Sequence, residues 1–499
     1  MPRSFDSRLA LFACVVGGAA GSLPAQTGAR AEFTPPRVTV DAGTLVGTVD
    51  SATGVLAFLG VPFALRPVGA RRWRPPEPAA PWTGDRRADE FGPACPQQAF
   101  GGRAAPAASE DCLTLNVWTA AAPGVSTVRR PVLVWIHGGA FVAGRSRTPE
   151  TDGRELARRG AVVVSLNYRV GPLGFLAHPA LDAESPRGVS GNYGLLDQIA
   201  ALEWLRRNVA RFGGDSTRVT VFGESAGGMS VGMLVASPLA RGLFQRAVMQ
   251  SGTGAGFAIP LRGAPGARSA HSAGEALARD LGIDGRGPEA AAALRRATPD
   301  QLADAMRRTK NPREIDAEIR PAVDGWVLPR AVERAVEERT ANRVPVLLGT
   351  NADEGSIFFR EPPVRAVATV DSMRRADWGG GAAEIARHYP VAGDADLVPQ
   401  AARMFGDSLF GVQARVFAKA AAARGWPVYV YHFTRRAESG PAALLGAFHT
   451  AEIPFTFGRA PSTPSSGRTA YDAALADTIS GYWLAFAGTG DPNGGGRPA

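Results

Sequence analysis

A serine between glycines is the feature of this sequence with the clearest potential for chemistry. Ser225 lies at the centre of FGESAGG, a G-x-S-x-G pattern in which a sharp strand-to-helix turn exposes the hydroxyl as a nucleophile. The pattern alone is weak, because 60 of the 499 residues are glycine and a second match, GMSVG, surrounds Ser230. The surrounding sequence must therefore decide between the two serines.

Only Ser225 has the context that this chemistry needs. The apolar stretch RVTVFG precedes it and favours a buried strand, and a helical pattern begins near Ala226. Ser230 falls inside the element that follows the turn, where a packing role is expected. The turn also directs the amides at a helix start toward the point where an oxyanion would develop. We therefore predict that Ser225 is the nucleophile.

A serine nucleophile needs a general base. His449, in GAFHTAEIPFTFG, follows a predicted strand on a glycine-flanked segment, so a loop at the carboxyl edge of a sheet can present it. His137 ends the strand PVLVWI directly before Gly138 and Gly139, a place better suited to backbone donors. The remaining histidines lie in helical, turn or strand patterns: His178, His271, His388 and His432. His449 is the candidate base, with a purely structural role as the alternative.

A carboxylate must hold the imidazole in the correct tautomer and stabilise its positive charge. The stretch VPVLLGTNADEGS places Asp353 and Glu354 just after an apolar strand. The resulting chain order of nucleophile, acid and histidine fits an α/β-hydrolase. The residues alone do not choose between Asp353 and Glu354.

The elements around these residues predict an α/β fold. Short β-branched stretches alternate with helical patterns from about residue 131 to the helix that opens near Ala226, which indicates a large, mostly parallel central sheet covered by helices on both faces. A β-rich entry begins at Val38, and polar helical stretches between 268 and 310 suggest a helical cap region. We expect residues 33–499 to form a single domain.

The amino terminus is typical of a secretory signal peptide over residues 1–25. Arg3 and Arg8 precede an apolar stretch from residue 9 to 20, and small residues follow. Its removal would take Cys14 away and leave Cys95 and Cys112, which we expect to pair in an oxidising compartment; two unpaired thiols are the alternative. We therefore predict a secreted or periplasmic protein without stable membrane insertion.

The net charge of +9 is not a sign of nucleic-acid binding. Lysine occurs only at positions 310 and 419, and the arginines are interleaved with acidic residues, as in RRADE and VERAVEERT. We therefore expect no nucleic-acid partner.

Ordered motifs along the chain resemble those of the type-B carboxylesterases, the family that includes the cholinesterases. They are EDCLTLNVW (110–118), HGGAF (137–141), NYRVGPLGFL (167–176), GNYGLLDQIAALEWL (191–205), FGGDSTRVTVFGESAGG (212–228), GTNADEGSIF (349–358) and GAFHTAEIPFTFG (446–458). The resemblance implies a serine hydrolase that cleaves a small-molecule carboxylic ester through an acyl-enzyme, with no cofactor and no metal. It assigns Ser225 as nucleophile, His449 as base and Glu354 as acid.

The same resemblance implies further roles. It assigns an oxyanion hole to the backbone amides of Gly138, Gly139 and Ala226, and a disulfide to Cys95 and Cys112. The loop between these cysteines lacks the tryptophan of the cholinesterases, so we expect neutral esters to be preferred over choline esters.

Several alternatives remain open at the level of sequence. The same triad serves amidases, lactonases and carbamate hydrolases, and a non-catalytic adhesion-type relative is a further alternative. Relatives commonly continue past GDPN, so the C-terminus is expected to be truncated at GGGRPA. The sequence does not set the oligomeric state or the physiological substrate.

Overall fold

The structure is a computed structural model that describes residues 35–99, 105–120, 128–264, 267–309, 319–359, 370–372, 374–375, 379–461, 469 and 471–494. The described residues belong to one unit that begins at Pro35. The predicted signal peptide, residues 100–104 of the loop between the cysteines and the last five residues lie outside them. The expectations that rest on those segments stay predictions.

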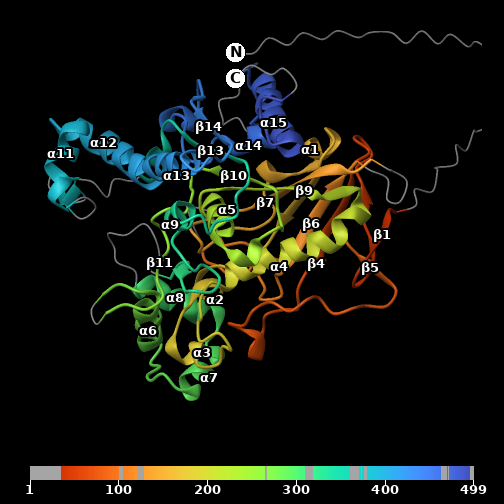
Figure 1. Ribbon diagram of the computed structural model, residues 1–499, viewed down its shortest axis with the longest axis horizontal. Helices are drawn as coiled ribbons and strands as arrows, with labels where there is room; N and C mark the ends of the chain where they lie inside the picture. Colours follow the sequence, from red (N-terminus) through yellow and green to blue (C-terminus); the bar gives the residue numbers. More distant parts are fainter. Residues whose placement is uncertain are drawn as a thin grey trace, which may run out of the picture. The chain divides into compact units, whose positions relative to one another are not determined.

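A mixed sheet forms the centre of the described part of the chain (Figure 1), with the strand order β14-β13-β10-β9-β7-β8-β6-β4-β3. The strands from β14 to β8 in that order run parallel, whereas β6, β4 and β3 pair antiparallel. Their bounds are β3 (Thr48–Val49), β4 (Leu56–Pro62), β6 (Thr114–Thr119), β7 (Arg130–Ile136), β8 (Val162–Leu166), β9 (Gly214–Glu224), β10 (Arg246–Gln250), β13 (Val346–Asn351) and β14 (Val428–Phe433).

Two smaller sheets accompany it. The first pairs the strands of the β-rich entry in the order β1-β2-β5, and the second joins β11 to β12. Their bounds are β1 (Arg37–Val40), β2 (Gly43–Val46), β5 (Asp85–Arg87), β11 (Ile259–Pro260) and β12 (Ala322–Val323).

Each face of the central sheet buries its own core, because successive side chains of a strand point to opposite faces. On β7, Val134 packs with residues of α4 (Tyr193–Asn208) and α5 (Ala226–Ala236). The next residue, Trp135, packs on the other face with α1 (Arg154–Arg158) and α15 (Tyr471–Thr489). Figure 1 shows α4 and α15 on these opposite sides. The predicted sheet with both faces covered is confirmed.

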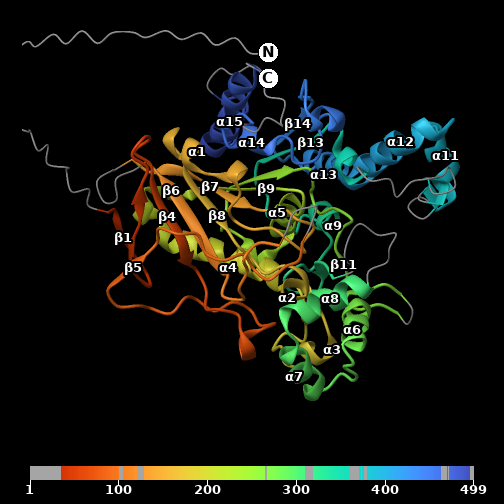
Figure 2. The ribbon, with the colours of Figure 1, turned by 180° about the vertical axis from the view of Figure 1, so that it is seen from behind.

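The remaining helices connect the strands and extend beyond the sheet. The polar stretches between 268 and 310 form α6, α7 and α8; α6 contacts α8, α8 contacts the short helix α2, and α7 contacts the short helix α3 (Figure 2). The bounds are α2 (Gly171–Phe175), α3 (Pro179–Asp182), α6 (Ala270–Asp280), α7 (Pro288–Arg296), α8 (Pro299–Thr309), α9 (Val332–Glu337), α11 (Ala382–His388), α12 (Asp394–Gly406), α13 (Val412–Ala422) and α14 (Ile453–Thr456). Within the described residues, no helix combines the length and apolar character needed to cross a membrane.

The predicted disulfide is present. The sulfur atoms of Cys95 and Cys112 are bonded at 2.02 Å, and both residues are buried in the main core. The bridge closes the loop that leads from the β-rich entry into β6, so this loop is tied covalently to the sheet.

Candidate active site

Ser225 occupies a sharp turn between β9 and α5. Its backbone has φ 56° and ψ −124°, a combination that residues other than glycine rarely adopt. Two backbone hydrogen bonds hold it there: its N–H donates to the Gln250 carbonyl at 2.9 Å, and its carbonyl accepts from the Met229 N–H at 2.8 Å. The side chain makes no capping bond to α5, and the residue is only partly buried. Its hydroxyl is therefore available for chemistry.

Glycines allow this turn to pack against the neighbouring strand. A Cβ built on Gly227 would lie 2.1 Å from the Ile136 carbonyl oxygen, and one on Gly223 would lie 2.5 Å from the Gly227 carbonyl carbon. No side chain fits at either position. Ser230, by contrast, is completely buried inside α5 and accepts a hydrogen bond from the Gln198 side chain at 3.1 Å.

Glu354 and His449 meet at the same edge of the sheet. Glu354 begins the 3₁₀ helix η5 (Glu354–Phe359), three residues after the end of β13, and its Oε2 lies 2.7 Å from His449 Nδ1. The other oxygen of Glu354 accepts the Asn351 N–H at 2.8 Å. Both side chains are buried, each residue being 4% exposed. The carboxylate is thus fixed by the end of its own strand and can orient the imidazole.

Asp353, the other sequence candidate, has a different set of contacts. Its carboxylate accepts the Ala447 N–H at 2.7 Å and the Arg436 guanidinium at 2.9 Å, while its own N–H donates to the Ala447 carbonyl at 2.9 Å. Asp353 therefore anchors the backbone of the loop that carries His449 and does not reach the imidazole.

The second imidazole nitrogen faces the residue before the serine. His449 Nε2 lies 3.1 Å from Glu224 Oε1, and within the described residues the Ser225 hydroxyl makes no hydrogen bond. Since Glu224 precedes Ser225 in the chain, the imidazole edge is directed at the nucleophile turn. The structure thus brings Glu354 and His449 together and places the imidazole against Glu224, the residue that precedes Ser225.

Buried carboxylates set the electrostatics of this site. Burial lowers the pKa of His449, but Glu224, Glu354 and Glu452 together outweigh burial and raise that pKa to about 9. Burial raises the pKa of Glu224 to about 8, and the positive charge of His449 opposes this rise. The pKa of Glu452 is likewise raised, by burial first and by Glu354 next. The surroundings therefore favour a positive charge on the imidazole.

The loop of residues 137–144, here termed the 137–144 loop, lies against the serine turn. A Cβ built on Gly138 would lie 3.1 Å from the Ser225 Cβ, and Gly139 has φ 111°. No described residue accepts a hydrogen bond from the N–H of Gly138 or Gly139. Ala226 is the first residue of α5, so its N–H has no acceptor within the helix. The two segments that meet at Ser225 therefore carry three amides without backbone acceptors.

Aromatic rings cover one side of the imidazole. The Phe410 ring, in the π-helical segment η7 (Asp407–Gly411), stacks on His449 with centroids 4.5 Å apart, and Phe358 lies 5.3 Å away. Phe405 of α12 packs on Phe358 at 5.0 Å. This apolar wall keeps water from one side of the base.

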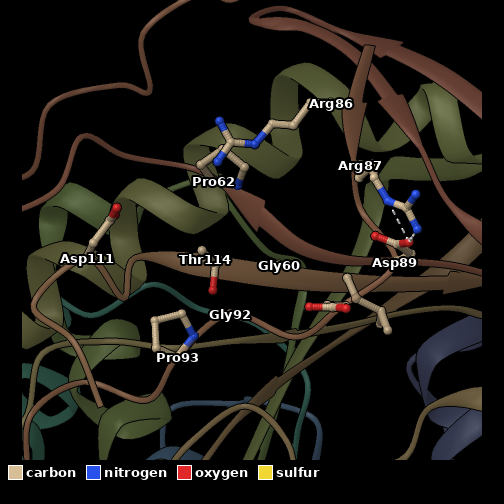
Figure 3. A pocket seen from close by; sticks show the side chains of 11 residues that line it. Gly60, Pro62, Arg86, Arg87, Asp89, Gly92, Pro93, Asp111 and Thr114 are labelled. Atoms are coloured by element: carbon tan, nitrogen blue, oxygen red, sulfur yellow. Dashed lines mark hydrogen bonds and ion pairs between the residues drawn. The ribbon is translucent and has the colours of Figure 1, made fainter. Parts of the chain in front are cut away.

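A separate hollow lies elsewhere on the molecule. It measures about 410 Å³ and opens between β4, β5 and β6, where Arg87 of β5 pairs with Asp89 (Figure 3). None of the three residues predicted for catalysis lines it, so this hollow is not the place where they would react. Nowhere in the described ranges do three or more His, Cys, Asp or Glu side chains form a group suited to a metal ion.

Two of the carboxylates near His449 were missed by the sequence analysis. Glu224 lies inside the quoted FGESAGG motif, and Glu452 lies three residues after His449. Side chains of Gln250 and Asn351 donate to Glu452 at 3.0 and 2.6 Å. The available signal was an acidic residue close in sequence to Ser225 and another close to His449, but the sequence did not show that these side chains are buried.

Comparison with known proteins shows the family of this chain. The model of the "Carboxylesterase family" matches residues 34–499. The chain belongs to the carboxylesterase family. It is 40% identical over 462 residues to the fumonisin B1 esterase of Sphingopyxis macrogoltabida, covering 90% of this chain and 82% of that relative. It is 36% identical over 466 residues to the para-nitrobenzyl esterase of Bacillus subtilis (strain 168), covering 91% and 90%.

Solved structures show the same relationship. A structure titled PNB esterase superposes on this carboxylesterase with a TM-score of 0.78 at 37% identity, covering 92% of each chain. A thermophilic PNB esterase gives a TM-score of 0.78 at 36% identity, again covering 92% of each chain. The fold is therefore the predicted α/β-hydrolase fold, and the protein is a carboxylic ester hydrolase.

Proposed function

We propose that this carboxylesterase cleaves its substrate through an acyl-enzyme formed on Ser225, with His449 as general base and Glu354 as the carboxylate that orients it. The observation that carries the proposal is the 2.7 Å hydrogen bond between Glu354 and His449. It lies at the edge of the central sheet where β9 ends, directly before Ser225. This pairing fixes the proton on Nδ1, so that Nε2 is the nitrogen free to take a proton.

In the first half of the reaction, His449 Nε2 removes the Ser225 proton while Oγ attacks the ester carbonyl carbon. The negative charge that develops on the carbonyl oxygen receives hydrogen bonds from the amides of Gly138, Gly139 and Ala226. The bond from carbon to the alkoxy oxygen then breaks, and His449 passes its proton to the departing alcohol.

In the second half, water replaces the alcohol. His449 takes a proton from the water as its oxygen attacks the acyl carbon, and the same amides bind the new oxyanion. Breakage of the bond to Oγ returns the proton to Ser225 and releases the carboxylic acid. The chain's own residues suffice for each of these proton transfers.

Glu224 has a supporting role in this scheme. Its carboxylate lies 3.1 Å from Nε2, so the imidazole turns from Glu224 toward Ser225 when it accepts the proton. When Glu224 is ionised, its negative charge stabilises the imidazolium that forms during attack. The aromatic wall of Phe358 and Phe410 strengthens both interactions by limiting water at the base.

Substrate class follows in part from the relatives. The two curated relatives are esterases whose printed names specify fumonisin B1 and para-nitrobenzyl esters. We infer that this enzyme takes small-molecule esters with a bulky alcohol or acyl part. The disulfide is compatible with a secreted protein, and we propose that residues 1–25 act as a signal peptide ahead of a single domain over residues 33–499.

A serine-directed phosphonate tests the assignment. We expect the label on Ser225 after peptide mapping, and essentially no turnover of a neutral p-nitrophenyl ester by Ser225→Ala. Ser230→Ala is the matched control and should keep its labelling at Ser225. A label on any other serine, or an active Ser225→Ala enzyme, would overturn the proposed nucleophile.

A further inference from the structure

Gln97 connects the disulfide-closed loop to the 137–144 loop. Its side-chain oxygen accepts the Gly144 N–H at 2.8 Å, and its side-chain nitrogen donates to the Gly144 carbonyl at 2.7 Å. The same nitrogen also donates to the carbonyl of Cys95 at 3.0 Å. One amide side chain thus satisfies both backbone groups of Gly144 and is itself held beside the disulfide.

Gly144 in turn packs against the first residues of the 137–144 loop. A Cβ on Gly144 would lie 2.1 Å from His137 Nδ1 and 2.3 Å from the Gly138 carbonyl oxygen, and its φ is 118°. The His137 ring bonds the Gly138 carbonyl at 2.9 Å. Any shift of Gly144 therefore moves the peptide that follows Gly138, and this peptide carries the Gly139 N–H.

We propose that Gln97 is a positioning residue for the oxyanion hole, an inference that rests on the role proposed above for Gly138 and Gly139. Gln97 clamps Gly144, and Gly144 supports the peptide between Gly138 and Gly139. The amide of Gly139 is thereby aimed at the point where the oxyanion forms. The Cys95–Cys112 bridge fixes the backbone of Cys95, to which the Gln97 side chain also donates. The disulfide therefore acts on catalysis through Gln97.

The clamp matters more for the transition state than for substrate binding. An oxyanion donor works only when it is fixed in place before the charge develops. A donor displaced by about 1 Å can lower the rate by about a hundredfold. The ground-state ester carries little charge on its carbonyl oxygen, so its binding depends far less on the loop.

The experiment compares Gln97→Ala with Gln98→Ala in the full chain. Gln98 is the neighbouring residue of the same type, but its side chain donates to Asp304 at 2.7 Å, on α8 and away from the loop. With a neutral p-nitrophenyl ester, we expect Gln97→Ala to lower kcat by about tenfold to a hundredfold, with KM changed less than about threefold. The affinity for a trifluoromethyl ketone, whose adduct carries the oxyanion, should fall in parallel, and Gln98→Ala should match the wild type.

Gln97→Glu provides a second variant that does not depend on the first one folding. A charged glutamate can accept from the Gly144 N–H but cannot donate to its carbonyl, whereas a protonated glutamate can do both. The ratio of its kcat to that of the wild type should therefore rise as the pH is lowered toward the pKa of the introduced carboxyl. A ratio that stays constant with pH, or an unchanged kcat in folded Gln97→Ala, overturns the inference.

Failure of this inference is distinguishable from failure of the proposed function. If the phosphonate labels Ser225 in the wild type but Gln97→Ala keeps full kcat, only the role of Gln97 is wrong. If the phosphonate does not label Ser225, the proposed nucleophile is wrong whatever the behaviour of the Gln97 variants.

Discussion

The two halves of the candidate site are held in place by different physical means. Ser225 is fixed by backbone: a strand, a helix start and glycines that leave no room for a side chain against Ile136. His449 lies on a loop and is fixed by side-chain carboxylates, with Glu354 on its ring and Asp353 on the loop backbone. The serine half depends on close packing of backbone, whereas the histidine half depends in addition on charge and side-chain hydrogen bonds.

This difference predicts how each half fails. The serine side should be sensitive to added volume and insensitive to pH, because packing against a carbonyl has no titratable part. The histidine side should in addition be sensitive to the loss of a charge and to pH, because carboxylates orient the imidazole. Three substitutions test the contrast.

The largest expected effect is that of Glu354→Gln. The amide keeps the shape of the side chain but loses the charge and favours the wrong imidazole tautomer, so we expect kcat to fall by about ten-thousand-fold. Steady-state kinetics with a neutral ester measures it. Asp353→Asn is the matched control, since its remaining oxygen can still accept the Ala447 N–H. Equal losses in the two variants would contradict the assignment of Glu354 as the acid.

The next effect is on folding, from Gly227→Ala. The new Cβ would meet the Ile136 carbonyl oxygen at 2.1 Å, so we expect the free energy of unfolding to drop by about 3 kcal/mol, together with activity. Denaturant titration measures the change. Gly488→Ala in α15 is the control: no atom lies within 4 Å of its Cβ position, so it should be neutral or slightly stabilising. A Gly227→Ala protein as stable as the wild type would show that the turn tolerates volume.

The smallest effect is a shift of the pH profile in Glu224→Gln. Only neutral His449 can act as the base, so kcat/KM is lost as pH falls through the pKa of this imidazole. Glu224 raises that pKa, and its removal should therefore move the acid limb to lower pH, by about one unit. A plot of log kcat/KM against pH measures the shift. An acid limb that stays in place or moves upward would contradict the role given to Glu224.

The same contrast explains what the sequence alone could predict. The serine turn is a local feature, so the apolar strand, the glycines and the following helix were readable in about 20 consecutive residues around Ser225. The parallel sheet was predictable for the same reason, from alternating strand and helix patterns. The position of β6 between β8 and β4 was not, because strand order depends on contacts between distant segments.

The residues that orient His449 could not be predicted from short stretches of sequence. Asp353 and Glu354 are adjacent, and the choice depended on the direction in which the chain leaves β13, so the family resemblance had to supply it. The contact of Glu224 with His449 joins segments 225 positions apart, and no periodicity marks it. Gln97 was likewise unremarkable in the sequence, because its partner is a backbone group of a remote loop.

The strained backbone at Ser225 has a consequence for the evolution of the enzyme. A serine at a helix start usually caps the helix with its hydroxyl, but here the φ of 56° prevents this and adds a conformational cost of about 1–3 kcal/mol. Glycine would adopt the same backbone angles freely. Mutants recovered in a screen for thermal stability alone would therefore include Ser225→Gly. This variant would be more stable but would lack the nucleophile. Only continued selection for turnover keeps the serine in place.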